Sequence, residues 1–209
     1  MTLSTTARGA LLSLGLCLGG APAIAGGPLG IDHRVDYDQA GIWSRGSQNV
    51  VLYGSFAAVV GGALWLGNED PLGHVFWQSV DSMVVANASA AVLKLVFTRS
   101  RPEQTADPDK WFQGPGHYSF PSGEVAHVAS IVTPFVLEYG ERHPAVYALE
   151  LLPLYTAIAR VKAQAHWQTD VLASFALGTA VGWYAHSRQT PITVNLLPRG
   201  VSVGWHKSF

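Results

Sequence analysis

The stretch "FPSGEVAHVASIVTPFVLEYG", residues 120–140, joins a turn to a long apolar segment. Ser122 is a good N-cap residue, so we expect a helix that begins near Ser122 and runs to about Tyr139. Gly123 lets a ligand approach the backbone closely, and the free N–H groups at a helix start bind phosphate. Glu124 adds a carboxylate there, which is also common in an ordinary first turn. The stretch therefore predicts a helix whose start is either an anion site or a plain capped end.

Further apolar segments of helical length flank this one, over residues 49–67, 72–99, 145–160 and 166–186. Pro102 stops the second of them, because a proline disfavours helix at the residue before it. Residues 26–45 are mixed and Gly-rich, which indicates a surface arm. Residues 191–209 alternate apolar and polar positions on both sides of "PRG", which predicts a β-hairpin. We expect an all-α domain over 26–190, a bundle of about five to six helices, followed by a short C-terminal β-hairpin at 191–209.

The first 25 residues read as a secretory signal peptide. Arg8 supplies the positive start, residues 9–20 are a short apolar run, and Ala23-Ile24-Ala25 is an A-x-A cleavage signal. The alternative is a membrane anchor that stays attached. Cys17, the chain's single cysteine, lies in this leader, so the mature chain would hold no disulfide. Export to a bacterial periplasm or cell envelope fits these features.

Bulk composition leaves the membrane question open. The chain has 209 residues, of which 48% are hydrophobic and 13% charged, and its mean hydropathy is only +0.20. The uncharged runs at 46–68 and 171–187 are long enough for a short span, so we expect membrane association, either as an exported bundle or as an integral protein. The net charge of −1 gives no global basic field, so nucleic acid is not an expected partner.

Two other segments carry charged residues in an apolar setting. In "KLVFTRSRP", Lys94 and Arg101 are seven apart, so on a helix they would share a face. The alternative is an ordinary basic helix end, which the helix dipole favours. In "ARVKAQAHWQTD", His166 and Asp170 are four apart, so the carboxylate could accept a hydrogen bond from one ring nitrogen and leave the other free for attack. Arg160 is off that face unless the helix breaks near residues 162–165.

Taken together, these three segments resemble the signature of the type-2 phosphatidic acid phosphatase superfamily, which includes lipid phosphatases, bacterial acid phosphatases and vanadium haloperoxidases. The family pattern is Lys, six residues, Arg-Pro; then Pro-Ser-Gly-His; then Ser-Arg, five residues, His, three residues, Asp. Lys94 with Arg101-Pro102, the run 121–123, and Arg160 with His166 and Asp170 match it over about a third of the chain, residues 94–170.

The resemblance implies a role for each matching residue. His166 would be the nucleophile that forms a phosphohistidine, and Asp170 would hold its tautomer. The phosphate-binding residues would be Lys94, Arg101, Ser122, Gly123 and Arg160. No metal or other cofactor is implied, because three cations and a helix start supply the positive charge. The alternatives for His166 and Asp170 are a satisfied structural pair and a two-ligand metal corner, for which no third ligand stands at a characteristic spacing.

Two positions depart from the family pattern. Ala159 replaces the serine, and Glu124 replaces the histidine that protonates the leaving group. We hypothesise that a protonated Glu124 is the general acid and later the base for water. The other candidate proton donors are His127, three residues further along the same helix, and His117 in the preceding loop.

These features predict an exported, metal-independent phosphatase that acts on a phosphomonoester or diphosphate. Hydrophobicity and the family resemblance favour a lipid substrate, such as a phosphatidate-type lipid, a polyprenyl diphosphate or lipid A. The alternatives are a broad-specificity soluble acid phosphatase acting on small phosphoesters, a vanadate-dependent haloperoxidase, and a non-catalytic phospholipid-binding envelope protein.

Overall fold

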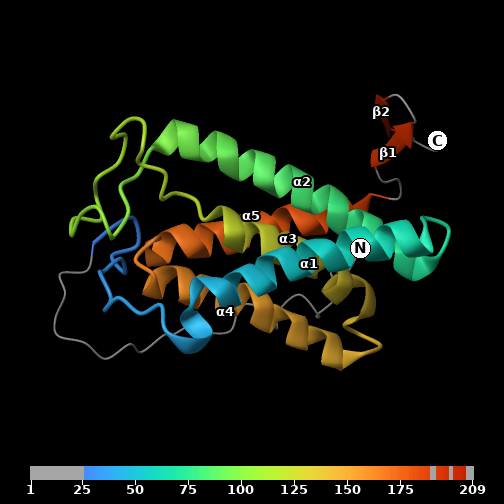
Figure 1. The fold of residues 1–209 in the computed structure, drawn as a ribbon, viewed down its shortest axis with the longest axis horizontal. Helices are drawn as coiled ribbons and strands as arrows, with labels where there is room; N and C mark the ends of the chain where they lie inside the picture. Colours follow the sequence, from blue (N-terminus) through green and yellow to red (C-terminus); the bar gives the residue numbers. More distant parts are fainter. Residues whose placement is uncertain (1–25, 189–191, 198–199, 206–209) are drawn as a thin grey trace, which may run out of the picture.

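A computed structural model describes residues 26–188, 192–197 and 200–205 of the chain. Over residues 26–188 the fold is an all-α bundle, as predicted (Figure 1). The helices are α1 (Arg45–Leu66), α2 (Pro71–Phe97), α3 (Gly123–Tyr139), α4 (Leu151–Lys162) and α5 (Gln168–Ser187), with short 3₁₀ turns η2 (Gly41–Trp43) and η3 (Pro144–Glu150). The expected signal peptide over 1–25 lies outside the described residues.

The strands β1 (Ile192–Leu197) and β2 (Gly200–Trp205) are antiparallel, with Ile192 opposite Trp205 and Leu197 opposite Gly200. Residues 198–199, which would form the turn of the expected hairpin, lie outside the described residues. The hairpin as a unit and the domain limits therefore stay predictions.

Local chemistry sets both ends of α2. Asp70 caps its start, because the carboxylate accepts hydrogen bonds of 2.9 Å from the two following free amides, and Pro71 occupies the first helical position. Thr98 ends the helix in a left-handed conformation, with φ of 33°. Lys94 therefore lies on the last turn, whereas Arg101 lies beyond the helix. The expectation that these two cations share one helix face was wrong.

The central helix is α3, which contacts α2, α4 and α5. Its contact with α5 is close because glycine is present at the crossing: a Cβ on Gly178 would lie 2.5 Å from the carbonyl oxygen of Ala126. The contact with α2 is polar in part, since Ser79 and Ser82 donate hydrogen bonds to carbonyl groups of α3. These contacts hold the start of α3 in a fixed place relative to α2 and α5.

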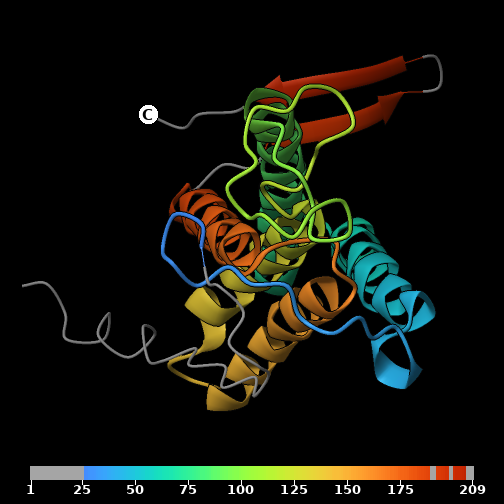
Figure 2. The same cartoon turned by 90° about the vertical axis from the view of Figure 1, so that its left-hand side faces the viewer.

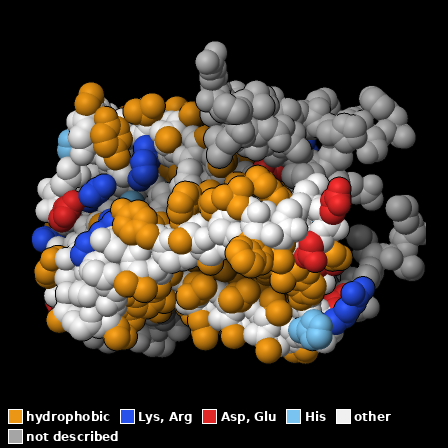
Figure 3. Space-filling model, turned by 45° about the vertical axis from the view of Figure 1, so that its right-hand side comes forward, with side chains coloured by type: hydrophobic (Ala, Val, Ile, Leu, Met, Phe, Trp, Pro, Cys, Tyr) orange, Lys and Arg blue, Asp and Glu red, His pale blue; other side chains and the backbone are white. Residues whose placement is uncertain are grey.

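The outward surfaces of α1 and α2 are apolar and largely uncovered. Both helices are long and apolar enough to cross a membrane, and only 11% and 22% of their most apolar windows are buried. Trp65 of α1 is 87% exposed. Figure 3 shows hydrophobic side chains over the middle of one face, with charged side chains toward its two ends. The span expected at 46–68 corresponds to α1, whereas the second candidate is α2 rather than the run at 171–187.

Several chain segments meet at one end of the bundle, on the left in Figure 1. There α2 ends, α4 ends, and α1, α3 and α5 begin. The arm at residues 26–40 and the loop at residues 98–122 cross over this end, which faces the viewer in Figure 2. Residues from all three motif segments are therefore brought to the same end of the molecule.

Candidate active site

His166 lies in the turn between α4 and α5 and is 3% exposed. Its Nδ1 is 2.6 Å from the carbonyl oxygen of Ser119. Because a carbonyl only accepts, Nδ1 must carry the proton and Nε2 must carry the lone pair. Burial lowers the pKa of His166 well below its usual value, and the neighbouring cations Lys94, Arg160 and Arg101 lower this pKa further. The ring is therefore neutral, and its Nε2 carries a lone pair.

Asp170 does not make the expected hydrogen bond to His166, since its Oδ2 is 3.9 Å from Nδ1. The reason is that α5 begins only at residue 168, so His166 is not on the same helix. The carboxylate instead accepts from Ser119 Oγ at 2.5 Å, from the Trp167 amide at 2.9 Å and from Arg99 at 2.6 Å. Ser119 links the two groups, and Asp170 positions His166 through it.

Arg99 forms a buried ion triad with Asp32 and Asp170. Each carboxylate is 2.6 Å from a guanidinium nitrogen, and all three side chains are 0% exposed. The guanidinium also donates to Thr169 Oγ1 and to the carbonyl of Pro108, so its hydrogen-bonding capacity is well used. Asp32 in turn accepts from the amide of Thr169 at 2.7 Å. We call Asp32, Arg99, Ser119 and Asp170 the buried platform.

The sequence analysis missed this platform and the role of the arm. Gln164, at φ of 52°, shapes the turn before His166, and its side chain accepts from Arg34 at 3.0–3.1 Å. Asp38 pairs with Lys162 at 3.1 Å, and its amide donates to the Lys162 carbonyl. The arm is thus bonded to the turn that carries His166. The only signal in the sequence was a cluster of polar residues in a segment that reads as a surface arm.

The opposite side of His166 has polar atoms without partners. Ser122 is the N-cap of α3, yet its Oγ makes no capping bond, and it is buried with no hydrogen-bond partner among the described residues. The same holds for Nε of Arg160. A Cβ on Gly123 would lie 3.9 Å from Lys94 Cε, so this backbone and the lysine border the same space. We call Ser122, Gly123, Arg160, Lys94 and Arg101 the phosphate seat, after the role that the sequence predicts for them.

Arg160 reaches the seat because α4 ends at Lys162, so the predicted helix break near residues 162–165 is confirmed. Lys94 Nζ donates to the carbonyl of Tyr118 at 2.7 Å, which anchors the ammonium against the loop. Arg101 pairs with Glu103 at 3.2 Å and remains partly exposed. All three cations lie close enough to His166 to act on its charge.

Glu124 lies between two guanidinium groups at the rim of the seat. Its carboxylate is 2.8 Å from Arg45 and 3.7 Å from Arg160. Gln48 completes the cluster, since its Oε1 accepts from Arg160 at 3.2 Å. Arg45 is a second residue that the sequence analysis missed, and it comes from the first turn of α1.

The two other candidate proton donors are bonded in different ways. His127 is 7% exposed, and its Nδ1 is 2.9 Å from the side-chain nitrogen of Asn87. His117 is half-buried in the loop two residues before Ser119, and its Nδ1 is 2.9 Å from Ser100 Oγ. Both therefore lie on segments that carry site residues.

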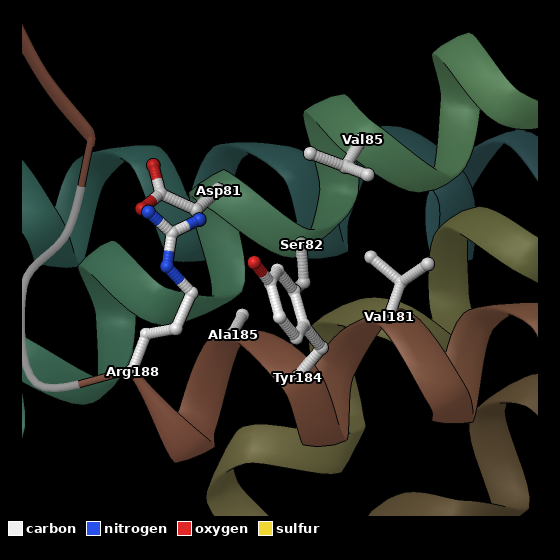
Figure 4. Close-up of a pocket in the computed structure, with 7 residues that line it drawn as sticks. All are labelled: Asp81, Ser82, Val85, Val181, Tyr184, Ala185 and Arg188. Atoms are coloured by element: carbon white, nitrogen blue, oxygen red, sulfur yellow. The ribbon is translucent and has the colours of Figure 1, made fainter. Parts of the chain in front are cut away.

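A small hollow lies away from the site, where α2 and α5 meet (Figure 4). Its volume of about 20 Å³ is room for about one water molecule. Figure 4 shows Asp81 and Arg188 pointing toward one another beside Tyr184. Nothing in this small hollow resembles the phosphate seat. Among the described residues, no group of three His, Cys, Asp or Glu side chains is placed to hold a metal ion.

The motif residues thus converge at one end of an α-helical bundle, and the family model for the PAP2 superfamily matches residues 76–192. The chain belongs to the PAP2 superfamily. A lipid A 1-phosphatase from Porphyromonas gingivalis is 37% identical over 91 residues, which are 43% of this chain and 18% of that protein. The match therefore spans less than a fifth of that relative's length.

Two solved PAP2-type structures are also similar to this chain. The crystal structure of Aquifex aeolicus LpxE covers 73% of this chain and 99% of its own, at 17% identity and a TM-score of 0.40. A transmembrane PAP2-type phosphatidylglycerolphosphate phosphatase from Bacillus subtilis covers 70% and 87%, at 18% identity and a TM-score of 0.38.

Proposed function

We propose that this PAP2 protein is a membrane-associated, metal-independent phosphatase that hydrolyses a phosphomonoester or diphosphate of a lipid through a phosphohistidine at His166. One observation carries the proposal. Next to a neutral, fixed imidazole, the buried donors Ser122 Oγ and Arg160 Nε have no partner among the described residues. Buried polar groups are almost always bonded, so a ligand rich in acceptor oxygens is the expected occupant. A phosphoryl group is such a ligand, and the arginine fork matches its oxygens.

In the first step, His166 Nε2 attacks phosphorus, and the bond from phosphorus to the leaving oxygen breaks. Lys94, Arg101 and Arg160 stabilise the negative charge on the phosphoryl oxygens, together with Ser122 and the backbone N–H groups at the start of α3. The buried platform keeps the proton on Nδ1 through the Ser119 carbonyl. This positions the lone pair of Nε2 toward the phosphate seat throughout the reaction.

Glu124 is the proposed proton donor to the leaving oxygen. Its carboxylate is 3.7 Å from Arg160, so it borders the position proposed for the phosphoryl group. After proton transfer to the leaving oxygen, the carboxylate is anionic. It then removes a proton from water, which attacks phosphorus, breaks the phosphorus–nitrogen bond and releases inorganic phosphate and His166.

A lipid substrate is supported by the apolar, largely uncovered faces of α1 and α2, which begin or end beside the site. The related lipid A 1-phosphatase points in the same direction, although it matches only part of each chain. We also propose that residues 1–25 direct export, so that the site faces the periplasm or cell envelope. The broad-specificity soluble acid phosphatase and the phospholipid-binding protein remain the alternatives.

The test is phosphate release from a substrate panel by the wild type and by His166→Ala, with and without EDTA. The panel contains a soluble aryl phosphate and detergent-dispersed phosphatidate, lipid A and a polyprenyl diphosphate. We expect EDTA-resistant release that is fastest with a lipid and is lost in His166→Ala. Faster release from the soluble ester would favour the acid phosphatase. No release from any substrate, with phosphate still bound, would favour the binding protein.

A further inference from the structure

An apolar groove lies beside the phosphate seat, between α1, α2 and α3. Its volume is about 420 Å³. Leu52, Tyr53 and Phe56 of α1 form one wall, so most of its surface is hydrocarbon. Gly123 borders both this groove and the phosphate seat, and the two are therefore continuous.

His127, which lines the groove, has one ring nitrogen without a hydrogen-bond partner among the described residues. Asn87 directs its side-chain nitrogen at both the Met83 carbonyl, at 2.8 Å, and Nδ1 of His127, at 2.9 Å. The carbonyl requires a donor, so the Asn87 nitrogen faces both groups and Nδ1 of His127 is an acceptor. Burial lowers the pKa of His127, which keeps the ring neutral with its proton on Nε2. That Nε2 is buried and has no partner among the described residues.

The distance from the phosphate seat to His127 matches the distance from a lipid's phosphate to the linkage of its chain. His127 is four residues after Gly123, so it lies on the same face of α3, about 6 Å further along the axis. A lipid whose phosphate occupies the seat would place the first few atoms of its chain linkage beside His127. An ester or amide carbonyl at that point is an acceptor, whereas a polyprenyl chain has none.

We propose that the groove binds the acyl chain of the substrate lipid, and that His127 Nε2 donates a hydrogen bond to the ester or amide carbonyl that joins this chain to the phosphorylated headgroup. The inference rests on the proposed phosphatase function and narrows its substrates to acyl-linked lipid phosphates. A site built to bond a polar group rejects the analogue that lacks it, because its own donor is then left unpaired. His127 is thus a specificity-determining residue rather than the proton donor.

A matched pair of substrates tests the hydrogen bond. Diacyl phosphatidate and its dialkyl ether analogue, with equal chain lengths and in the same detergent, differ only in the two carbonyl groups. For the wild type we expect kcat/KM to be about 10-fold higher with the ester, the effect of one buried hydrogen bond. In His127→Phe the ratio of kcat/KM for the ester to kcat/KM for the ether should fall to about 1. Equal rates for the two lipids in the wild type, or an intact ester preference in His127→Phe, would overturn the inference.

A second pair of variants tests the groove without changing His127. Leu52→Trp fills the groove, whereas Leu64→Trp makes the same change on the same helix at an exposed position outside it. We expect Leu52→Trp to lower turnover of phosphatidate at least 10-fold more than it lowers turnover of a soluble aryl phosphate, with Leu64→Trp close to the wild type on both. Equal behaviour of the two variants would overturn the inference. Absence of phosphate release from every substrate would instead overturn the proposed function on which it depends.

Discussion

The two sides of His166 differ in how their polar groups are bonded. On the platform side, Asp32, Arg99 and Asp170 are fully buried and joined by short hydrogen bonds and ion pairs. On the other side, Ser122 Oγ and Arg160 Nε are buried with no partner among the described residues. This difference separates the groups that position His166 from the groups proposed to bind the substrate. A satisfied buried network fixes geometry, whereas unsatisfied buried donors need a ligand. Four sets of measurements test this difference.

The largest expected effect is on the platform. Arg99→Met should lower the free energy of unfolding by about 3–5 kcal/mol, because it leaves two buried carboxylates without their shared cation. Arg101→Met is the matched control, since Arg101 is partly exposed and lies in the phosphate seat. The control should lose phosphatase activity with little change in stability. Chemical denaturation of both variants measures this, and equal stability of the two would contradict the assignment of Arg99 to the platform.

The second effect is on proton transfer. Glu124→Gln keeps the size of the side chain but removes its proton, so we expect turnover of an alkyl phosphate to fall about 100-fold. An aryl phosphate with a good leaving group should be much less affected in its first step, which needs no acid. The comparison of the two substrates in stopped-flow or burst experiments measures the difference. Full turnover of the alkyl phosphate by Glu124→Gln would exclude Glu124 as the general acid.

The third effect compares two serines that are three residues apart and equally buried. Ser119→Ala should cost about 1–3 kcal/mol of stability, because Asp170 loses a hydrogen bond inside the platform. Ser122→Ala removes an atom that has no partner among the described residues, so stability should be unchanged or slightly higher while kcat/KM falls about 10-fold. Thermal unfolding and kinetics on both variants measure the pair. A loss of stability in Ser122→Ala, together with a loss of kcat/KM but not of stability in Ser119→Ala, would contradict these assignments.

The smallest effect is on the pH dependence of stability. The pKa of His166 is lowered in the folded protein, so below its ordinary value of 6.5 the unfolded chain binds a proton that the native state does not. Acid therefore destabilises the fold, by about 1.4 kcal/mol per pH unit below 6.5 until the lowered pKa is reached. His166→Asn should have a shallower slope, with the contribution of His127 remaining because its pKa is also lowered. Identical slopes for the two proteins would contradict a neutral, buried His166.

Local sequence signals were enough to predict the helices and to select motif residues that lie on segments meeting at one end of the bundle. Ser122, Arg160 and His166 were identified from motif spacing, and the helix break after Lys162 was expected from the position of Arg160. These inferences depend on residues close together in the chain or on a fixed pattern. The expected face shared by Lys94 and Arg101 failed, because a single left-handed residue ends the helix between them.

The platform was not predictable in the same way. Asp32 bonds Thr169, which is 137 residues later, and no local pattern encodes such a contact. Arg99 stands two residues before the motif arginine Arg101 and has the same chemistry, so only the path of the chain after α2 decides which one turns inward. The proposed hydrogen bond from His166 to Asp170 failed for a related reason, since helical spacing was applied across a turn.

The most direct test of the account is chemical trapping of the phosphoenzyme. Wild-type protein is mixed with a substrate labelled in its phosphoryl group, quenched within the first turnover, and the label on the protein is mapped. A phosphohistidine intermediate predicts one labelled residue, His166. The label should be stable in alkali and lost in acid, and His166→Ala should carry no label. Label on another residue, or full turnover with none on His166, would contradict it.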